Sequence, residues 1–250
     1  MSGRDVCRAF LCRDGRAALS PLERCFPFLG GRGHAISLVG GGGKTTLMYA
    51  LAEAYRARGM KTAVITTTRI MKPACAVQTM EACRALWAAG EYAVCGEDAP
   101  QGKLSEPRQQ VLCALLEEAD ALLIEADGAK HMACKAPESH EPVLLPQSDI
   151  VIGVIGAEVL GKKVEEVCFR PERVCEALRC GMVHKLTADD LAALLVSEQG
   201  TRKGVGERSY HVVINKCDDA ARIQNGLEIA RALRRFGHEN TVLTSFQSGR

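Results

Sequence analysis

The stretch AISLVGGGGKTTLMY, residues 35–49, determines how the rest of the chain is interpreted. It begins with a short apolar run typical of a buried strand, continues with four glycines, and then reaches Lys44, Thr45 and Thr46, which open a segment with helical character. Strand, glycine turn and helix in this order are typical of a phosphate-binding loop, because backbone N–H groups can surround a phosphate only where side chains do not intrude. The stretch therefore predicts a nucleotide-binding site.

The residues of this turn have separate predicted roles. Lys44 is expected to reach the terminal phosphates and to act in catalysis, and the Thr45 hydroxyl is expected to bind Mg²⁺. The phosphate-loop pattern also asks for a glycine five residues before Gly43, where this chain has Leu38. A flexible turn before a helix is the alternative interpretation. The residues expected to surround the nucleotide phosphates are Gly40, Gly41, Gly42, Gly43, Lys44, Thr45 and Thr46.

Composition indicates an ordinary globular chain. Of its 250 residues, 25% are charged and 47% hydrophobic, which suits one α/β domain with additions. The formal net charge of +2 predicts no basic face for nucleic acid or membranes. No apolar run approaches the roughly 20 residues that cross a bilayer, and the first residues lack the apolar core of a signal peptide. We therefore expect a cytoplasmic protein that binds neither nucleic acid nor membrane.

Strand and helix patterns alternate along the chain. The glycine turn is followed by a helical pattern over 44–58 and an apolar strand over 61–66, which together make the βαβ unit of a parallel sheet. The predicted fold is therefore α/β, a mostly parallel sheet with helices on both faces, as in P-loop NTPases. Residues 1–34 are expected to be an N-terminal adaptor and 35–250 the P-loop NTPase-like domain. Within that domain a helical insertion over about 157–208 is expected to form a lid or a small subdomain.

The other elements follow from the same patterns. Residues 96–105 are polar and rich in turn residues, so a mobile loop is expected there. Further strands are expected over 92–95, 121–125, 149–156, 210–214 and 240–243, and further helices over 79–90, 106–119, 172–179, 187–197 and 219–236.

The strand expected over 121–125 ends in Glu125-Ala126-Asp127-Gly128. P-loop proteins that hydrolyse nucleotides place a carboxylate at such a strand end to hold Mg²⁺ or its water. Glu125 and Asp127 are therefore both candidate Mg²⁺ ligands, and Asp127 is also expected to orient the attacking water. An acidic turn without function is the alternative, because Asp-Gly is a favoured turn pair.

Two further segments are expected to border the same site. Thr67 and Thr68 close the second strand, at the edge where ligands of parallel sheets bind, although threonine is also a good strand former. Residues 129–147 contain three prolines and no periodicity, which is typical of a functional loop. This segment would border the terminal phosphate as a switch or a substrate-binding loop. Its candidate residues are Lys130, Lys135, His140 and Glu141.

Asn215-Lys216-Cys217-Asp218 follows the strand expected over 210–214. Asn-Lys-x-Asp in this place is the guanine-reading box of GTPases, in which the Asp218 carboxylate would accept the N–H donors of guanine and the Lys216 stem would lie along the ring. Thr244 and Ser245 stand where GTPases place their last base-contacting loop. The box favours GTP slightly over ATP.

The chain has twelve cysteines and no C-x-x-C pair. Several fall inside expected helices or strands, so buried free thiols that pack as small hydrophobes are expected. The spacing of Cys168, Cys175 and Cys180 matches no metal-site pattern.

Four segments together resemble the YqeC family: VGGGGKTT (39–46), TTTRIMKP (66–73), IEADGAKHMACKAPESHEPVLLP (124–146) and VIGAEVLGKKVEEVCFRPE (154–172). The family is described as accessory proteins of selenium-dependent molybdenum hydroxylases, and the resemblance spans about 35–245. It implies a P-loop NTPase-like fold and a role in maturing a selenium-containing molybdenum cofactor. The functional candidates that the resemblance carries over are Gly40 to Thr46, Thr67, Thr68, Glu125, Asp127, Lys135, His140 and Glu141.

Three functions are compatible with these features. The first is a Mg²⁺-dependent GTP or ATP hydrolase that serves as a maturation factor for a selenium-dependent molybdenum hydroxylase or its cofactor. The second is a small-molecule kinase or nucleotidyltransferase whose acceptor is held by His140 and Lys135. The third is a nucleotide-gated binding protein that hydrolyses nothing at a useful rate. No glutamine or arginine in the sequence is convincing as the residue that completes hydrolysis, so slow intrinsic turnover is expected.

Overall fold

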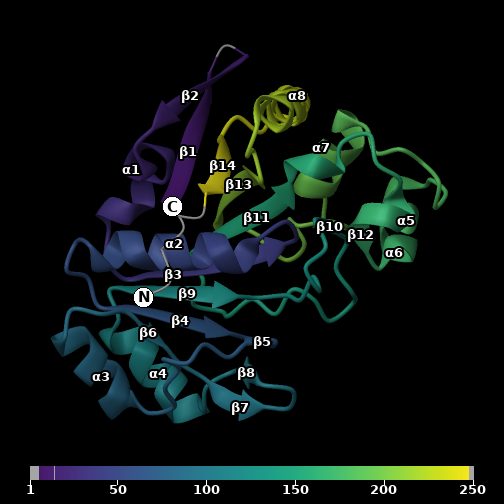
Figure 1. Ribbon diagram of the computed structural model, residues 1–250. Coiled ribbons are helices and arrows are strands. Elements are labelled where there is room, and N and C mark those ends of the chain that lie inside the picture. The colour runs from purple at the N-terminus through teal and green to yellow at the C-terminus, as the bar shows by residue number, and fades with distance from the viewer. Residues whose placement is uncertain (1–5, 14, 248–250) are drawn as a thin grey trace.

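The computed structural model describes residues 6–13 and 15–247. Residues 1–5 and 14 of the expected adaptor, and 248–250 of the expected main domain, lie outside this range. A nine-stranded sheet organises the described residues (Figure 1). Its spatial order is β2 (Arg16–Ser20), β1 (Val6–Arg13), β14 (Thr241–Gln247), β13 (Ser209–Asn215), β11 (Ile150–Gly156), β3 (His34–Gly40), β9 (Ala121–Glu125), β4 (Thr62–Thr66) and β6 (Ala93–Val94).

The seven strands from β14 to β6 are parallel, which confirms the α/β class and the mostly parallel sheet. From β3 the chain passes through a helix to β4 on one side, and β11 lies on the other side of β3. Such a switch in direction opens a ligand crevice at the carboxyl ends of the strands. Gly40, Glu125, Gly156 and Asn215 all lie at that edge.

Helices cover both faces of the sheet (Figure 1). One face packs against α2 (Lys44–Arg56), α1 (Leu22–Cys25) and the 3₁₀ turn η1 (Pro27–Gly30), with Leu47 and Leu51 of α2 among the buried side chains. The other face packs against α3 (Met80–Ala88) and α4 (Gln109–Glu118) at one end and α7 (Ala188–Val196) and α8 (Ala220–Arg235) at the other. The strands alternate between these two cores: Val213 faces the first and Val212 the second.

Residues 97–105 form a hairpin, so the mobile loop expected over 96–105 is wrong. Strands β7 (Glu97–Ala99) and β8 (Lys103–Ser105) pair antiparallel, and β5 (Ile70–Met71) adds a third strand. Gln101 and Gly102 both adopt positive φ between them, the backbone conformation of a tight hairpin turn. The polar residues of this segment belong to the turn and the exposed face, and Leu104 is buried.

The N-terminal segment extends the main sheet. β1 pairs antiparallel with β14 and with β2, two strands that the sequence patterns did not predict. Because β1 covers it, β14 runs to Gln247 and includes Thr244 and Ser245, which were expected in a loop after residue 243.

The segment between β11 and β13 contains η2 (Ala157–Val159), α5 (Val164–Val167), β12 (Cys168–Phe169) and α6 (Pro171–Leu178) before α7. Helix α7 is a core helix: Leu191 and Leu195 are buried, and Thr187 and Asp190 form a reciprocal N-terminal cap. By contrast, α5 and α6 lie beyond the arrowhead of β9 (Figure 1). There β12 pairs with β10 (Cys134–Lys135) in a two-stranded sheet. Within the described residues, no helix is both long and apolar enough to cross a membrane.

Candidate phosphate and nucleotide site

The glycine turn is shorter than a standard phosphate loop. β3 continues to Gly40 and α2 begins at Lys44, so three residues separate the two elements. Leu38 is fully buried in β3, where it pairs with Glu125 and Ile152. The missing glycine of the pattern therefore has a structural reason, because the strand passes through the position where the longer loop would begin.

The turn packs closely against neighbouring backbone. Gly42 has φ +76°, and a Cβ there would lie 2.3 Å from the Gly156 nitrogen, so a side chain at Gly42 would clash with β11. The Gly41 N–H donates to Val154 O and the Gly42 N–H to Met132 O, at 2.9 and 3.0 Å. These two N–H groups thus fix the turn against the protein in this conformation.

The N–H groups of Gly43, Lys44, Thr45 and Thr46 differ, because they donate to no other described residue. Gly43 precedes the helix with φ +106°, and no side chain caps α2. The first N–H groups of a helix have no acceptor within the helix, and the helix dipole adds partial positive charge there. Four N–H groups beside a lysine are donors of the kind that bind a phosphate group, and we call them the phosphate seat.

The structure brings Thr45 and Glu125 together. The Thr45 hydroxyl donates to Glu125 Oε2 at 2.5 Å, across the gap between α2 and the end of β9. Glu125 is 6% exposed, and burial raises the pKa of its carboxyl, although Lys44 and Thr45 oppose this effect. The free-energy cost of burying a charged carboxylate of this kind falls when a cation binds beside it.

The residues at this point suit a magnesium ion. Mg²⁺ takes hard oxygen ligands, and commonly one or two protein oxygens together with substrate phosphates and water. The Thr45 hydroxyl and the Glu125 carboxylate supply two such oxygens at the edge of the phosphate seat. Within the described chain, no cluster of three or more His, Cys, Asp or Glu side chains offers a closed metal site.

Asp127 faces the lysines. Its carboxylate lies 3.0 Å from Lys44 Nζ and 3.2 Å from Lys135 Nζ, and it accepts the Gly40 N–H at 2.9 Å. Lys44 Nζ also donates to Gly40 O at 2.6 Å. Lys44 and Asp127 are both almost fully buried. Of the two predicted Mg²⁺ ligands, Glu125 therefore shares the position of Thr45, whereas Asp127 holds the lysine.

A chain of opposite charges continues from Asp127 to α6. Lys135 is fully buried and donates to Glu141 Oε2 at 2.6 Å, and Arg170 donates to the same carboxylate oxygen at 2.6 Å. Arg170 also pairs with Glu138. Burial alone raises the pKa of Glu141, but its contacts with Lys135 and Arg170 lower that pKa to about 2. The chain links the phosphate turn to the N-terminus of α6.

The guanine-box residues lie beside the phosphate turn. Asn215 is buried, donates to Gly42 O at 2.8 Å and accepts from Thr244 at 2.9 Å. Asp218 is exposed and accepts from the Ser245 hydroxyl at 2.9 Å. Asn215 thus ties the box to the turn, and Ser245 positions the carboxylate predicted to read the base.

The remaining candidates are placed less centrally. Thr67 and Thr68 are half-buried beyond the end of β4, and the Thr67 hydroxyl donates to Val143 O at 2.9 Å. His140 is exposed and has no hydrogen bond or ion pair with another described residue. The predicted acceptor role of His140 therefore has no geometric support within the described residues.

Two residues near the site, His131 and Glu158, were not proposed from the sequence. His131 lies close enough to Glu125 to lower the pKa of that carboxyl, and Lys130 and His131 both adopt positive φ. Two consecutive residues of this kind indicate a strained turn, which is common at functional sites. Glu158 pairs with Lys216 of the guanine box. Single charged residues give no pattern in a sequence, so only the fold reveals these two.

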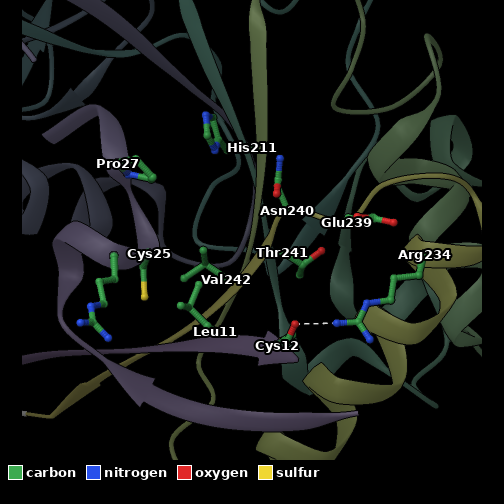
Figure 2. Close-up of a pocket in the computed structure, with 11 residues that line it drawn as sticks. Leu11, Cys12, Cys25, Pro27, His211, Arg234, Glu239, Asn240, Thr241 and Val242 are labelled. Carbon is green, nitrogen blue, oxygen red and sulfur yellow. Dashed lines mark hydrogen bonds between the residues drawn. The ribbon is translucent and has the colours of Figure 1, made fainter. Parts of the chain in front are cut away.

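A cavity of about 610 Å³ lies elsewhere, at the amino ends of β13 and β14 (Figure 2). Its polar lining includes Arg24, Arg234 and Glu239, which are exposed, and His211, which is half-buried. Arg234 reaches across to the backbone oxygen of Cys12 at 2.5 Å. None of these groups takes part in the charge chain described above.

Every cysteine lies within the described residues and is a free thiol. Seven are buried, including Cys83, Cys95 and Cys134, as expected for thiols that pack as small hydrophobes. Cys113 is exposed on α4, although it was expected inside a packed helix. Burial raises the pKa of Cys12 to about 12 and that of Cys25 to about 11, so both stay protonated and unreactive.

Comparison with known proteins adds two findings. The family model described as YqeC protein matches residues 36–172. The chain is also 34% identical over 199 residues to a protein of Escherichia coli (strain K12) that carries the name "Uncharacterized protein YqeC"; the match covers 74% of this chain and 78% of that protein. The matched range of the family model contains the glycine turn, the end of β9 and Arg170.

Proposed function

Since the chain belongs to the YqeC family, we propose that it is a Mg²⁺-dependent nucleotide-binding protein that hydrolyses GTP, or less readily ATP, as an accessory factor for selenium-dependent molybdenum hydroxylases. The family membership leaves the activity open, so the proposal rests on the site. The accessory role rests on the resemblance alone. The residues that carry that resemblance over 124–146 and 154–172 also supply the charge chain from Asp127 to Arg170.

The observation that carries the proposal is the meeting of the α2 N-terminus with the end of β9. Thr45 contacts Glu125, and Lys44 contacts Asp127, although these pairs are about eighty residues apart in the sequence. Free helix N–H groups, a lysine, a hydroxyl and two carboxylates are the groups that bind and activate a nucleotide phosphate. A glycine turn that only connects a strand to a helix does not require this combination of groups.

The residues divide the work as follows. The N–H groups of the first turn of α2 bind one phosphate, and Lys44 neutralises charge on the transferred phosphoryl group. Thr45 and Glu125 would hold Mg²⁺, which would supply charge stabilisation for the phosphate oxygens when bound. Asp127 positions Lys44 and competes with an incoming phosphate for it. Asp127, or a nearby residue such as His131, would orient the attacking water.

The charge chain supports a coupling between the nucleotide and α6. A phosphate that replaces Asp127 as the partner of Lys44 would leave Asp127 paired with Lys135 alone. Lys135 also pairs with Glu141, and Glu141 pairs in turn with Arg170. Arg170 is the residue that precedes α6. Nucleotide binding would thus change the ion pairs between loop 129–147 and the inserted helices α5 and α6. These helices act as a lid and as the docking element for the hydroxylase or its cofactor.

The test is the Mg²⁺ dependence of nucleotide binding. Wild-type protein is titrated calorimetrically with GTP and with ATP, in Mg²⁺ and in EDTA. We expect Thr45→Val to bind in Mg²⁺ only as weakly as wild type binds in EDTA, because the hydroxyl that shares the cation with Glu125 is lost. The matched control is Thr62→Val, a buried threonine at the amino end of β4, which should retain the Mg²⁺ effect. Equal Mg²⁺ dependence in both variants would reject the proposed metal position.

Products separate the three functions. Release of free phosphate from GTP alone supports hydrolysis, and transfer only after an acceptor is added supports a kinase or nucleotidyltransferase. Tight binding without turnover supports a nucleotide-gated binding protein. The exposed, unbonded state of His140 gives the acceptor hypothesis no additional weight, so hydrolysis is the function proposed.

A further inference from the structure

Glu158 has a carboxylate oxygen, Oε2, that is buried and has no hydrogen-bond partner among the described residues. The other oxygen, Oε1, pairs with Lys216 Nζ. The side chain as a whole is 22% exposed, so Glu158 is partly open to solvent although its Oε2 is buried. An unpaired buried acceptor is costly and calls for an explanation, such as a partner supplied by a ligand.

The position of Glu158 lies between the phosphate seat and the guanine box. Its carboxylate folds over Gly156, where a Cβ would lie 2.2 Å from Oε2. Gly156 also meets Gly42 of the phosphate turn, and it pairs in register with Asn215. On the other side, Glu158 contacts Lys216 of the box. A nucleotide with its phosphates in the phosphate seat and its base at the guanine box would place its sugar between the two, beside Glu158.

We propose that Glu158 binds the 2′ and 3′ hydroxyls of a ribonucleotide. This inference rests on the proposed function and specifies its substrate class. Ribose presents two neighbouring O–H donors, and a carboxylate presents two acceptor oxygens at a matching separation. Gly156 has no side chain to hold the carboxylate in place, so Glu158 turns outward when the ribose arrives. Lys216 balances the charge of Glu158 in the free protein.

The experiment compares ribose with deoxyribose on the full-length protein. Binding of GTP, 2′-deoxy-GTP and 3′-deoxy-GTP in Mg²⁺ is measured by calorimetry for wild type, Glu158→Gln and Glu158→Ala. ATP and its two deoxy forms are used in parallel. We expect wild type to bind the ribonucleotide about tenfold more tightly than either deoxy form, since hydrogen bonds to a charged group are lost. This ratio should fall to about twofold in both variants, because the ribonucleotide loses two hydrogen bonds to Glu158 and each deoxy form loses only one.

Glu97→Gln is the control, because Glu97 also has a buried oxygen without a hydrogen bond, although that oxygen forms an ion pair with Arg108 at 3.2 Å, and it lies in the separate β5-β7-β8 sheet. It should keep the tenfold ratio. Equal wild-type affinity for ribo and deoxy forms, or an equal loss of all ligands in Glu158→Gln, would overturn the ribose assignment while leaving the phosphate seat standing. Failure of every nucleotide to bind wild type would overturn the proposed function and this inference together.

Discussion

The two edges of the parallel sheet differ in how they hold charge. At the carboxyl ends of the strands, Lys44, Asp127, Lys135 and Glu141 are all buried and paired with one another, beside N–H groups that donate to no other described residue. At the amino ends of β13 and β14 there is a cavity of about 610 Å³, but its charged groups are exposed (Figure 2).

The difference shows which observation identifies a site. A cavity with exposed charges costs the fold little and is compatible with many neutral uses. Buried charges are expensive to desolvate and are maintained only by partners placed with precision. The edge at the carboxyl ends of the strands, where the charges are buried, is therefore the better candidate for a functional site, even though it is the more closed of the two in this conformation.

The largest expected effect comes from Lys44. Lys44→Ala removes the buried ammonium beside the proposed phosphate seat, and we expect at least a thousandfold loss of GTP affinity or turnover, equivalent to about 4 kcal/mol. Calorimetry and phosphate release measure it. Arg234→Ala, the control in the cavity, should change either quantity less than twofold. Wild-type binding and turnover in Lys44→Ala would discard the phosphate seat.

The next effect is on stability. Lys135→Met leaves Asp127 and Glu141 with fewer partners in a buried place, and we expect the free energy of unfolding to fall by about 3 kcal/mol. Denaturant unfolding monitored by circular dichroism measures this. The matched variant Arg234→Met removes an exposed guanidinium and should cost less than about 1 kcal/mol. If the two variants lose the same stability, the edges do not differ in the way described.

Asp218 gives a smaller and more selective effect. Asp218→Asn replaces one acceptor oxygen with a donor, so we expect about a tenfold loss of GTP affinity with ATP unaffected. Asp219→Asn is the neighbouring control, whose carboxylate caps α8. Competition titrations with both nucleotides measure the ratio. Equal loss for GTP and ATP, or no loss, would remove the guanine assignment.

The smallest effect is the pH dependence of stability. The raised pKa of buried Glu125 means that the fold favours its protonated form, so its contribution is full below the ordinary value of 4.5 and declines as pH rises through the folded pKa. Glu125→Gln should therefore gain stability over wild type as pH rises above 4.5, without added Mg²⁺. Unfolding curves across a pH series measure this difference, and a flat difference would contradict the burial argument.

Glu141 should show the opposite sign. Its pKa is lowered to about 2 by Lys135 and Arg170 against the effect of burial, so its contribution is present above 4.5 and is lost as pH falls toward 2. The advantage of wild type over Glu141→Gln should therefore shrink on acidification. Two carboxylates of one site with opposite pH profiles would be difficult to explain by any general acid effect.

Local patterns predicted the elements that depend on local physics. The strand Ala121–Glu125 agrees with its expected bounds because a short apolar run between turn signals is unambiguous. The helix expected over 187–197 corresponds to α7, and its cap is formed locally by Thr187 and Asp190. The meeting of Thr45 with Glu125 was predicted because the carboxyl ends of parallel strands share one edge.

Long-range pairing explains what the patterns missed. β1 and β2 lie at the sheet edge, where polar and apolar residues mix, and β1 is a strand because β14 pairs with it. The hairpin of β7 and β8 is short and polar, so it resembled a loop. The charge chain through Lys135 and Arg170 joins segments about thirty-five residues apart. No local rule pairs particular charges over such separations.

The most direct test of the phosphate seat is amide hydrogen exchange of the full-length protein with and without GTP and Mg²⁺. The N–H groups of Gly43, Lys44, Thr45 and Thr46 donate to no other described residue, so they should exchange rapidly in the free protein and become strongly protected with nucleotide. Exchange around the cavity, at residues 239–242, should not change. Protection at 239–242 with none at 43–46 would contradict the account.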